Sequence, residues 1–235
     1  MKYVGDVFQI AAYVYFGKVV YDVLKLPIVW TIVVAILILA VAYVLCTLLH
    51  ESGHLVGGWI NGYHLLSFQI GPLKLVREYG EYQLHREKIL NHQCVMIPDG
   101  SVRHCSAYLM GGVGFSALVG VLACIVDLNM CERGFGYLAV YAIAVCCMCK
   151  TVINGLPYFK HHVPQNDCAW FILVHLDPLT NAEYFLYLIC YERFANHQTL
   201  KDVKKPEVAP GRFYSDIFWT EILKMRKQDQ EEKRG

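Results

Sequence analysis

Two histidines and a glutamate form a pattern whose residue types and spacing can do metal and acid–base chemistry. His50, Glu51 and His54 fit the motif HExxH, here with the letters HESGH. On a helix the two imidazoles lie one turn apart on the same face, where both can reach one metal ion. Zinc suits imidazole ligands, and a catalytic zinc site leaves one position open for water. Glu51 would take a proton from that water, so the pattern predicts zinc-assisted hydrolysis.

The motif comes at the end of an apolar run that is long enough to cross a membrane. The 24 residues from Leu26 to Leu49 carry no charge, and a membrane-spanning helix needs about 20. A match to three fixed positions can arise by chance. An ionised side chain within a bilayer, however, costs roughly 3 kcal/mol on insertion scales, so such groups usually have a function. Three ionisable groups so close together on a membrane helix therefore favour a shared metal ion over chance.

The composition indicates a membrane protein with several spans. The chain has 235 residues, of which 56% are hydrophobic, and a formal net charge of +1. This small charge says nothing about nucleic acid, and no basic, aromatic patch suggests it, so we expect no nucleic-acid partner. The lipid bilayer is the expected partner instead. The 10 cysteines fall mostly in apolar runs without the regular spacing of a disulfide framework, so we expect buried thiols.

The order of apolar and polar segments predicts an α-helical polytopic membrane protein. We expect three core transmembrane helices, a small membrane-associated β-sheet insert, and amphipathic helices at both ends. The expected spans cover about residues 28–60, 105–127 and 134–156, the insert covers about 63–86, and the polar segment 88–104 is expected to be a loop. The domains would be an N-terminal part at 1–27, the core at 28–168, and a cytosolic helical region at 169–235.

The N-terminal apolar segment allows two interpretations. Residues 7–24 are long enough for an extra span, but they include Gln9, Lys18 and Asp22. If this segment were a span, the charges of Lys18 and Asp22 would lie in hydrocarbon. An interfacial amphipathic helix is therefore the favoured interpretation.

A third metal ligand is expected after the last core helix. That helix ends where Pro157 follows Asn154, and an irregular stretch leads to Asp167 at the start of a new apolar helix. Irregular backbone near membrane depth is tolerated where protein or a wet cavity satisfies it, so a carboxylate there suits a metal ligand. As an alternative, Asp167 caps the following helix, and His161 or His162 is the third ligand.

Small residues predict close helix packing around the motif. Gly53 and Gly57 remove bulk from the motif helix, and Gly112, Ser116 and Gly120 repeat at four-residue intervals in the second core helix. Such stripes let membrane helices approach closely. We expect this stripe to be structural only, because none of its side chains does acid–base chemistry.

The distribution of basic residues predicts the orientation in the membrane. The segment after the motif helix has five lysines and arginines between residues 74 and 103, whereas the next connection has only Arg133. Since cytoplasmic loops are rich in lysine and arginine, the insert and the lysine-rich C-terminal region are expected in the cytosol. The protein would then be a multi-pass protein of the cell membrane, with its active site toward the cytosolic side.

These motifs resemble the site-2 protease family of intramembrane zinc metalloproteases. The shared features are HESGH at the end of a membrane helix, a sheet-like insert, and NGLP followed by ND on a later span. The stretch HESGHLVGGWINGYHLLSFQIGPLKLV is particularly similar to small bacterial members, and the resemblance runs from about Val29 to Cys168. Two positions depart from the family pattern. Ser52 replaces an apolar residue, and Cys168 stands where glycine normally follows the aspartate.

The resemblance implies three central spans and one zinc ion per chain, held by His50, His54 and Asp167. Glu51 would be the acid–base residue, and Asn154 would hold the substrate or support the site. A small member of this kind has no PDZ domain. Its substrate would be a membrane-embedded or membrane-tethered peptide, whose peptide bonds it hydrolyses.

The sheet insert suggests how such a substrate would be held. The strands around residues 68–76, with Phe68 and Ile70, would accept an extended peptide as an added edge strand.

Two other classes of protein are alternatives. A non-catalytic binding or immunity protein with a structural metal site would need the histidines but not Glu51. A metal transporter would need a polar pathway on both sides of the metal.

Overall fold

A computed structural model describes residues 2–99, 104–160, 163–164, 166–176, 178–196, 198, 200, 203 and 217–232. In this part of the chain, helices and strands follow one another in a mixed order that begins and ends with helices. They are α1 (Lys2–Leu24), α2 (Ile28–Ile60), β1 (Tyr63–Glu78), β2 (Glu81–Pro98), α3 (Ser106–Asn129), α4 (Phe135–Gly155), β3 (Phe159–Lys160), β4 (Val163–Pro164), α5 (Asp167–Leu176), α6 (Pro178–Ala195) and α7 (Ile217–Glu232).

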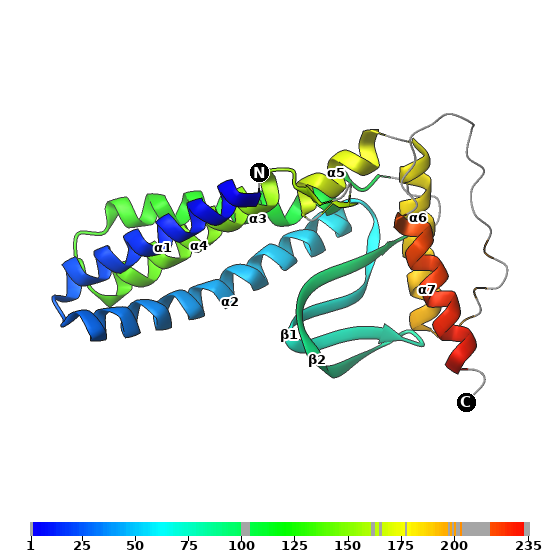
Figure 1. The fold of residues 1–235 in the computed structure, drawn as a ribbon, viewed down its shortest axis with the longest axis horizontal. Helices are drawn as coiled ribbons and strands as arrows, with labels where there is room; N and C mark the ends of the chain where they lie inside the picture. The colour runs from blue at the N-terminus through cyan, green and yellow to red at the C-terminus, as the bar shows by residue number, and fades with distance from the viewer. Residues whose placement is uncertain are drawn as a thin grey trace.

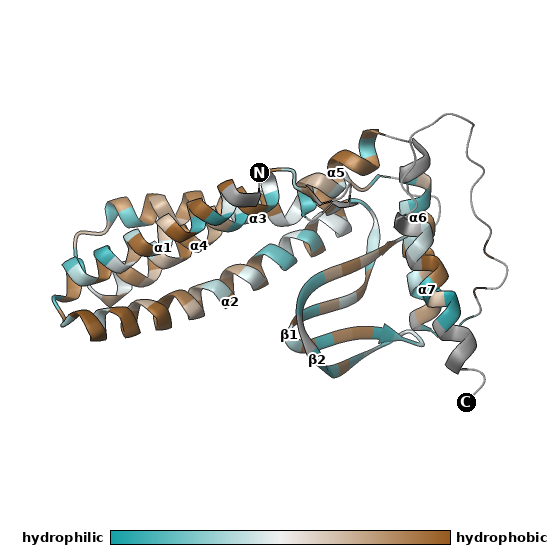
Figure 2. Cartoon of the chain, viewed as in Figure 1, coloured by the Kyte–Doolittle hydropathy of each residue, from teal (hydrophilic) through white to brown (hydrophobic). Residues whose placement is uncertain are grey.

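Four of these helices, α1 to α4, are long and apolar enough to cross a membrane. They run side by side along the long axis of the molecule (Figure 1). Apolar residues predominate along them, whereas the hairpin of β1 and β2 and the last helix mix apolar and polar residues (Figure 2). Helices α2, α3 and α4 begin and end close to the bounds of the three expected spans. The four apolar helices are consistent with a membrane location.

Helix α1 fits an extra span better than the favoured interfacial helix. It meets the criteria of length and composition over Val4–Leu24, and it packs along α4 and α2. Its apolar residues are not gathered on one face, as an interfacial helix would require. The charges that argued against a span lie near its end, where Lys18 is exposed and Asp22 pairs with Lys25 at 3.6 Å. Such side chains can extend toward the membrane surface.

Helices α2 and α3 cross with their backbones in contact. A Cβ atom at Gly53 would meet the carbonyl oxygen of Gly111, and one at Gly57 would meet the carbonyl oxygen of Ala107. Glycine at these two positions therefore permits the close approach that the sequence predicted. The contact holds the HExxH turn of α2 directly against α3.

The sheet insert is a long antiparallel hairpin of β1 and β2, and the predicted loop at residues 88–104 is wrong over most of its length. Strand β2 continues to Pro98, which pairs with Tyr63 at the base of the hairpin. The polar residues of this segment suggested a loop, but Cys94 and Met96 alternate onto a buried face as a strand requires. The strand pairing shifts register between Gly71 and Leu73, and such an irregularity bends a hairpin. The bend is visible in Figure 1.

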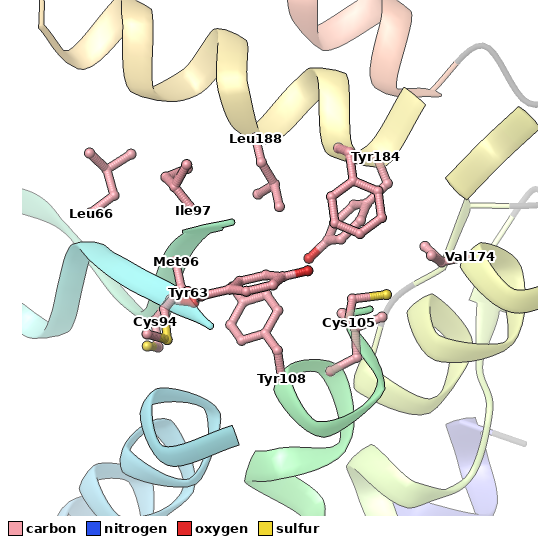
Figure 3. Close-up of a cluster of buried hydrophobic side chains, with 12 residues drawn as sticks. Tyr63, Leu66, Cys94, Met96, Ile97, Cys105, Tyr108, Val174, Tyr184 and Leu188 are labelled. Carbon is pink, nitrogen blue, oxygen red and sulfur yellow. The ribbon is translucent and has the colours of Figure 1, made fainter. Parts of the chain in front are cut away.

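A hydrophobic core joins the base of the hairpin to α3, α5 and α6 (Figure 3). Its buried residues are Tyr63, Leu66, Cys94, Met96, Ile97, Cys105, Tyr108, Leu109, Val174, Tyr184, Phe185 and Leu188. The C-terminal region is helical, as expected, although the apolar residues of α6 are not gathered on one face. Helix α6 contributes Tyr184, Phe185 and Leu188 to this core. Helix α7 packs against α6 through Ile222 and Met225.

Candidate metal centre

The three predicted ligands, His50, His54 and Asp167, lie together. Nε2 of His50 is 3.0 Å and Nε2 of His54 is 3.4 Å from Oδ2 of Asp167. One ligand atom from each of the three residues lies within 4.8 Å of the other two. Both histidines are buried. This group can hold a metal ion. The alternative ligands His161 and His162 lie outside the described residues.

Helix α3 orients both imidazoles. Nδ1 of His54 is 2.7 Å from the backbone carbonyl oxygen of Tyr108, and Nδ1 of His50 is 3.0 Å from the hydroxyl of Ser116. A carbonyl oxygen only accepts, so Nδ1 of His54 must donate and its Nε2 keeps a lone pair for a metal. The predicted purely structural role of the small-residue stripe is therefore incomplete, because Ser116 contacts a ligand.

Gly112 provides the space in which the ligand atoms meet. A Cβ atom at this position would collide with Nε2 of His54 and would lie 2.7 and 2.8 Å from Cε1 and Nε2 of His50. Any other residue would have to displace an imidazole. The sequence showed that Gly112 is small and faces another helix, but not that the other helix presents metal ligands there.

Asn166 holds the start of α5 in place. Its Oδ1 accepts a hydrogen bond from the backbone N–H of Ala169 at 3.1 Å, which is a helix cap. Its Nδ2 donates to the carbonyl oxygens of Ile153, in the last turn of α4, and of Leu156, just after that helix, each at 2.6 Å. The capping role that was the alternative for Asp167 thus belongs to Asn166. Asp167, the next residue, directs its carboxylate toward the histidines.

The environment of Asp167 fits a cation. Its Oδ2 is buried and makes no hydrogen bond of good geometry within the described structure, although two imidazole nitrogens lie close to it. Burial alone would raise the pKa of this carboxyl, but the interaction with His50 and His54 lowers it below its usual range. The carboxylate is therefore charged at neutral pH. Two imidazoles and a carboxylate are a donor set that catalytic zinc uses.

Glu51 lines a cavity beside the three ligands. The cavity has a volume of about 470 Å³ and also contacts His54 and Asp167. Glu51 itself is buried, with 7% of its surface exposed. A carboxylate next to a metal-binding group, facing a space large enough for part of a substrate, is placed for proton transfer.

The other predicted site residues do not line the cavity. Phe68 and Ile70 are on β1, where they pair with Cys94 and His92 of β2. The cavity wall includes these two β2 residues but neither Phe68 nor Ile70. Asn154 lies half-buried in the last turn of α4. The roles of Phe68, Ile70 and Asn154 therefore stay predictions.

Comparison with known proteins adds no family to this description. No protein-family model, no curated protein and no solved structure matches the chain. What the geometry shows is a group of three residues that can hold a metal ion, and a fourth residue that faces the adjoining cavity.

Proposed function

We propose that this protein is an intramembrane zinc metalloprotease of the site-2 protease type. It would hydrolyse peptide bonds of membrane-embedded or membrane-tethered peptides. The observation that carries the proposal is the placement of Glu51 in the wall of the cavity that adjoins His50, His54 and Asp167. A structural metal site needs ligands, but it does not need a buried acid facing an open space.

The three ligands would hold one zinc ion. When bound, zinc would supply Lewis acidity, which lowers the pKa of water from 15.7 to about 7 and polarises a carbonyl group. Ser116 and the carbonyl of Tyr108 contact the Nδ1 atoms of the two imidazoles, whose Nε2 atoms lie close to Asp167 and would be free to bind the ion.

Glu51 would move the protons. Its carboxylate would accept a proton from the attacking water and then deliver that proton to the nitrogen of the leaving amine. Glu51 is 7% exposed, so little of this side chain contacts bulk water. Glu51 and two of the ligands, His54 and Asp167, are part of one cavity wall, so a carbonyl bound in the cavity would face both the ligands and the base.

Strand β2, rather than β1, is the element beside which an extended substrate would lie. Gln93, Cys94 and Val95 of β2 line the cavity. In the described part of the chain, β2 pairs with β1 alone, so its other edge has no partner strand. A peptide unwound from a membrane helix would gain backbone hydrogen bonds there. The basic residues of the hairpin support an active site toward the cytosol.

Metal analysis combined with cleavage tests this proposal. We expect purified protein to contain one zinc ion per chain and to cleave a reporter peptide fused to a membrane span. Glu51→Gln should keep the zinc and lower the cleavage rate by about 10²- to 10⁴-fold, because a general base is lost. Glu132→Gln, a matched change in the exposed α3–α4 connection, should cleave normally.

Two results would contradict the proposal. Protein that cannot be loaded with zinc under any reconstitution has no such site. If the Glu51→Gln variant contains zinc and its activity equals that of the unmodified protein, the result would instead support a non-catalytic binding or immunity protein with a structural metal.

A further inference from the structure

The cavity beside the metal centre has two kinds of lining residue. Its wall includes the carboxylates Glu51 and Asp167, and it also includes apolar and aromatic side chains. The apolar and aromatic residues are Val95, Leu109, Trp170, Tyr184, Tyr187 and Leu188. They come from β2, α3, α5 and α6, so four elements enclose one space. We call this space the aromatic pocket.

The aromatic pocket begins directly beside the ligands. Trp170 follows Asp167 by three residues on α5, so the two side chains lie on neighbouring positions of one helix face. On α3, Leu109 follows Tyr108, whose carbonyl oxygen contacts His54. A group that is held at the ligands would therefore place its adjacent side chain in the pocket.

Helix α6 forms the wall opposite the hairpin. Tyr184 and Leu188 are one turn apart and point from α6 toward the base of the hairpin and α3 (Figure 3). Both are almost fully buried, with 6% and 2% of their surfaces exposed. Both side chains belong to the hydrophobic core, so this wall of the pocket is preformed.

The walls of the aromatic pocket are uncharged. Burial raises the pKa of the Tyr184 hydroxyl well above its usual value, and it raises the pKa of the nearby Cys94 thiol to about 12. Neither group ionises at neutral pH. A negatively charged side chain entering this pocket would lose its hydration without gaining a partner of opposite charge from these six residues, and such burial is strongly unfavourable.

We propose that the aromatic pocket selects substrates with a large apolar side chain, such as phenylalanine, at the residue next to the scissile bond. This inference rests on the proposed function and specifies its substrate class. Filling the pocket removes apolar surface from water, whereas alanine leaves the space to solvent or empty. Hydrophobic pockets discriminate by about 10- to 200-fold for small differences in side-chain size.

A pair of hydroxamates tests the pocket without requiring turnover. A hydroxamate binds zinc and presents the side chain of its amino acid beside the metal. We expect zinc-loaded protein to bind N-acetyl-phenylalanine hydroxamate about 10- to 100-fold more tightly than N-acetyl-alanine hydroxamate, measured by isothermal titration calorimetry. The aspartate analogue should bind no better than the alanine analogue.

Substitutions on α6 locate the preference. Leu188→Phe should fill part of the pocket and reduce the preference for phenylalanine several-fold, with little effect on the alanine compound. Ala182→Phe places the same side chain at an exposed position of α6 and should leave the preference unchanged. The comparison of the two compounds on unmodified protein does not depend on the folding of either variant.

The outcomes separate the two proposals. Equal affinity for the phenylalanine and alanine compounds would overturn the aromatic pocket and leave the zinc site intact. Tighter binding of the aspartate compound would also overturn the pocket. Binding of neither compound would overturn the pocket together with the proposed function, because both compounds depend on the metal.

Discussion

The two walls of the candidate site are built in different ways. On one side, α2 and α3 touch through their backbones, and Gly53, Gly57 and Gly112 leave no room for a Cβ atom. On the other side, β2, α5 and α6 face the site through large side chains and enclose a cavity of about 470 Å³. The first wall holds the histidines, and the second wall leaves space for a substrate.

This difference predicts how each wall responds to mutation. Where backbones touch, one added methyl group must displace a helix or an imidazole, because packed interiors tolerate little extra volume. Where side chains enclose a cavity, a change of one side chain other than Asp167 alters the shape of the space but leaves the ligands in place. Metal affinity should therefore respond to the α2–α3 wall and substrate fit to the α6 wall.

Gly112→Ala should have the largest effect on the metal. Its Cβ would occupy the space where Nε2 of His54 and Nε2 of His50 now lie. We expect zinc affinity to fall by more than the roughly 100-fold that the loss of an outer hydrogen bond can cause. Competition with a fluorescent zinc indicator measures this change. The helical content should stay near that of the unmodified protein in circular dichroism.

Gly114→Ala is the matched control for this experiment. Gly114 lies on the same helix, but a Cβ there would have no heavy atom within 4 Å. This variant should bind zinc normally. If Gly112→Ala binds zinc as tightly as Gly114→Ala does, the α2–α3 wall does not define the ligand positions.

Ser116→Ala should have an intermediate effect. The hydroxyl that contacts Nδ1 of His50 at 3.0 Å would be lost, while the packing would hardly change. Outer hydrogen bonds of this kind contribute about 10- to 100-fold to metal affinity, and we expect a loss at the lower end. Ser106→Ala removes a hydroxyl that contacts His175 away from the site, so its zinc affinity should not change. A similar affinity in both variants would show that Ser116 does not orient His50.

Local patterns in the sequence were sufficient for the part of the site that lies within one helix. The spacing of His50 and His54 predicted a shared ligand face, and the apolar run before them predicted α2. Helix α1 was harder to interpret, because Lys18 and Asp22 suggested an interfacial helix although both lie near its end. The extent of β2 was missed because its polar residues indicate a loop unless the covering core is known.

The residues that support the ligands could not be predicted, because their contacts join distant parts of the chain. His50 and Ser116 are 66 residues apart, and the hydroxyl of Ser116 has no feature that distinguishes it from an ordinary packing residue. Asn166 stood next to Asp167 in the sequence. Its preference for helix caps was a usable signal that could have separated the cap from the ligand.

Tyr108 belongs to both walls, so removing its hydroxyl tests whether the two walls act independently. It should have the smallest effect on zinc affinity. Its backbone carbonyl accepts from His54, while its hydroxyl donates to the carbonyl oxygen of Cys94 on β2 at 2.7 Å. Tyr108→Phe removes only the second contact. We expect zinc affinity to stay within about twofold and the protein to lose about 1 kcal/mol of stability, because one buried hydrogen bond is lost. Thermal unfolding in detergent measures the stability, and Tyr15→Phe, at a residue with 56% of its surface exposed, is the control. A large loss of zinc in Tyr108→Phe would show that the hairpin also sets the ligand geometry, and the two walls would then act as one.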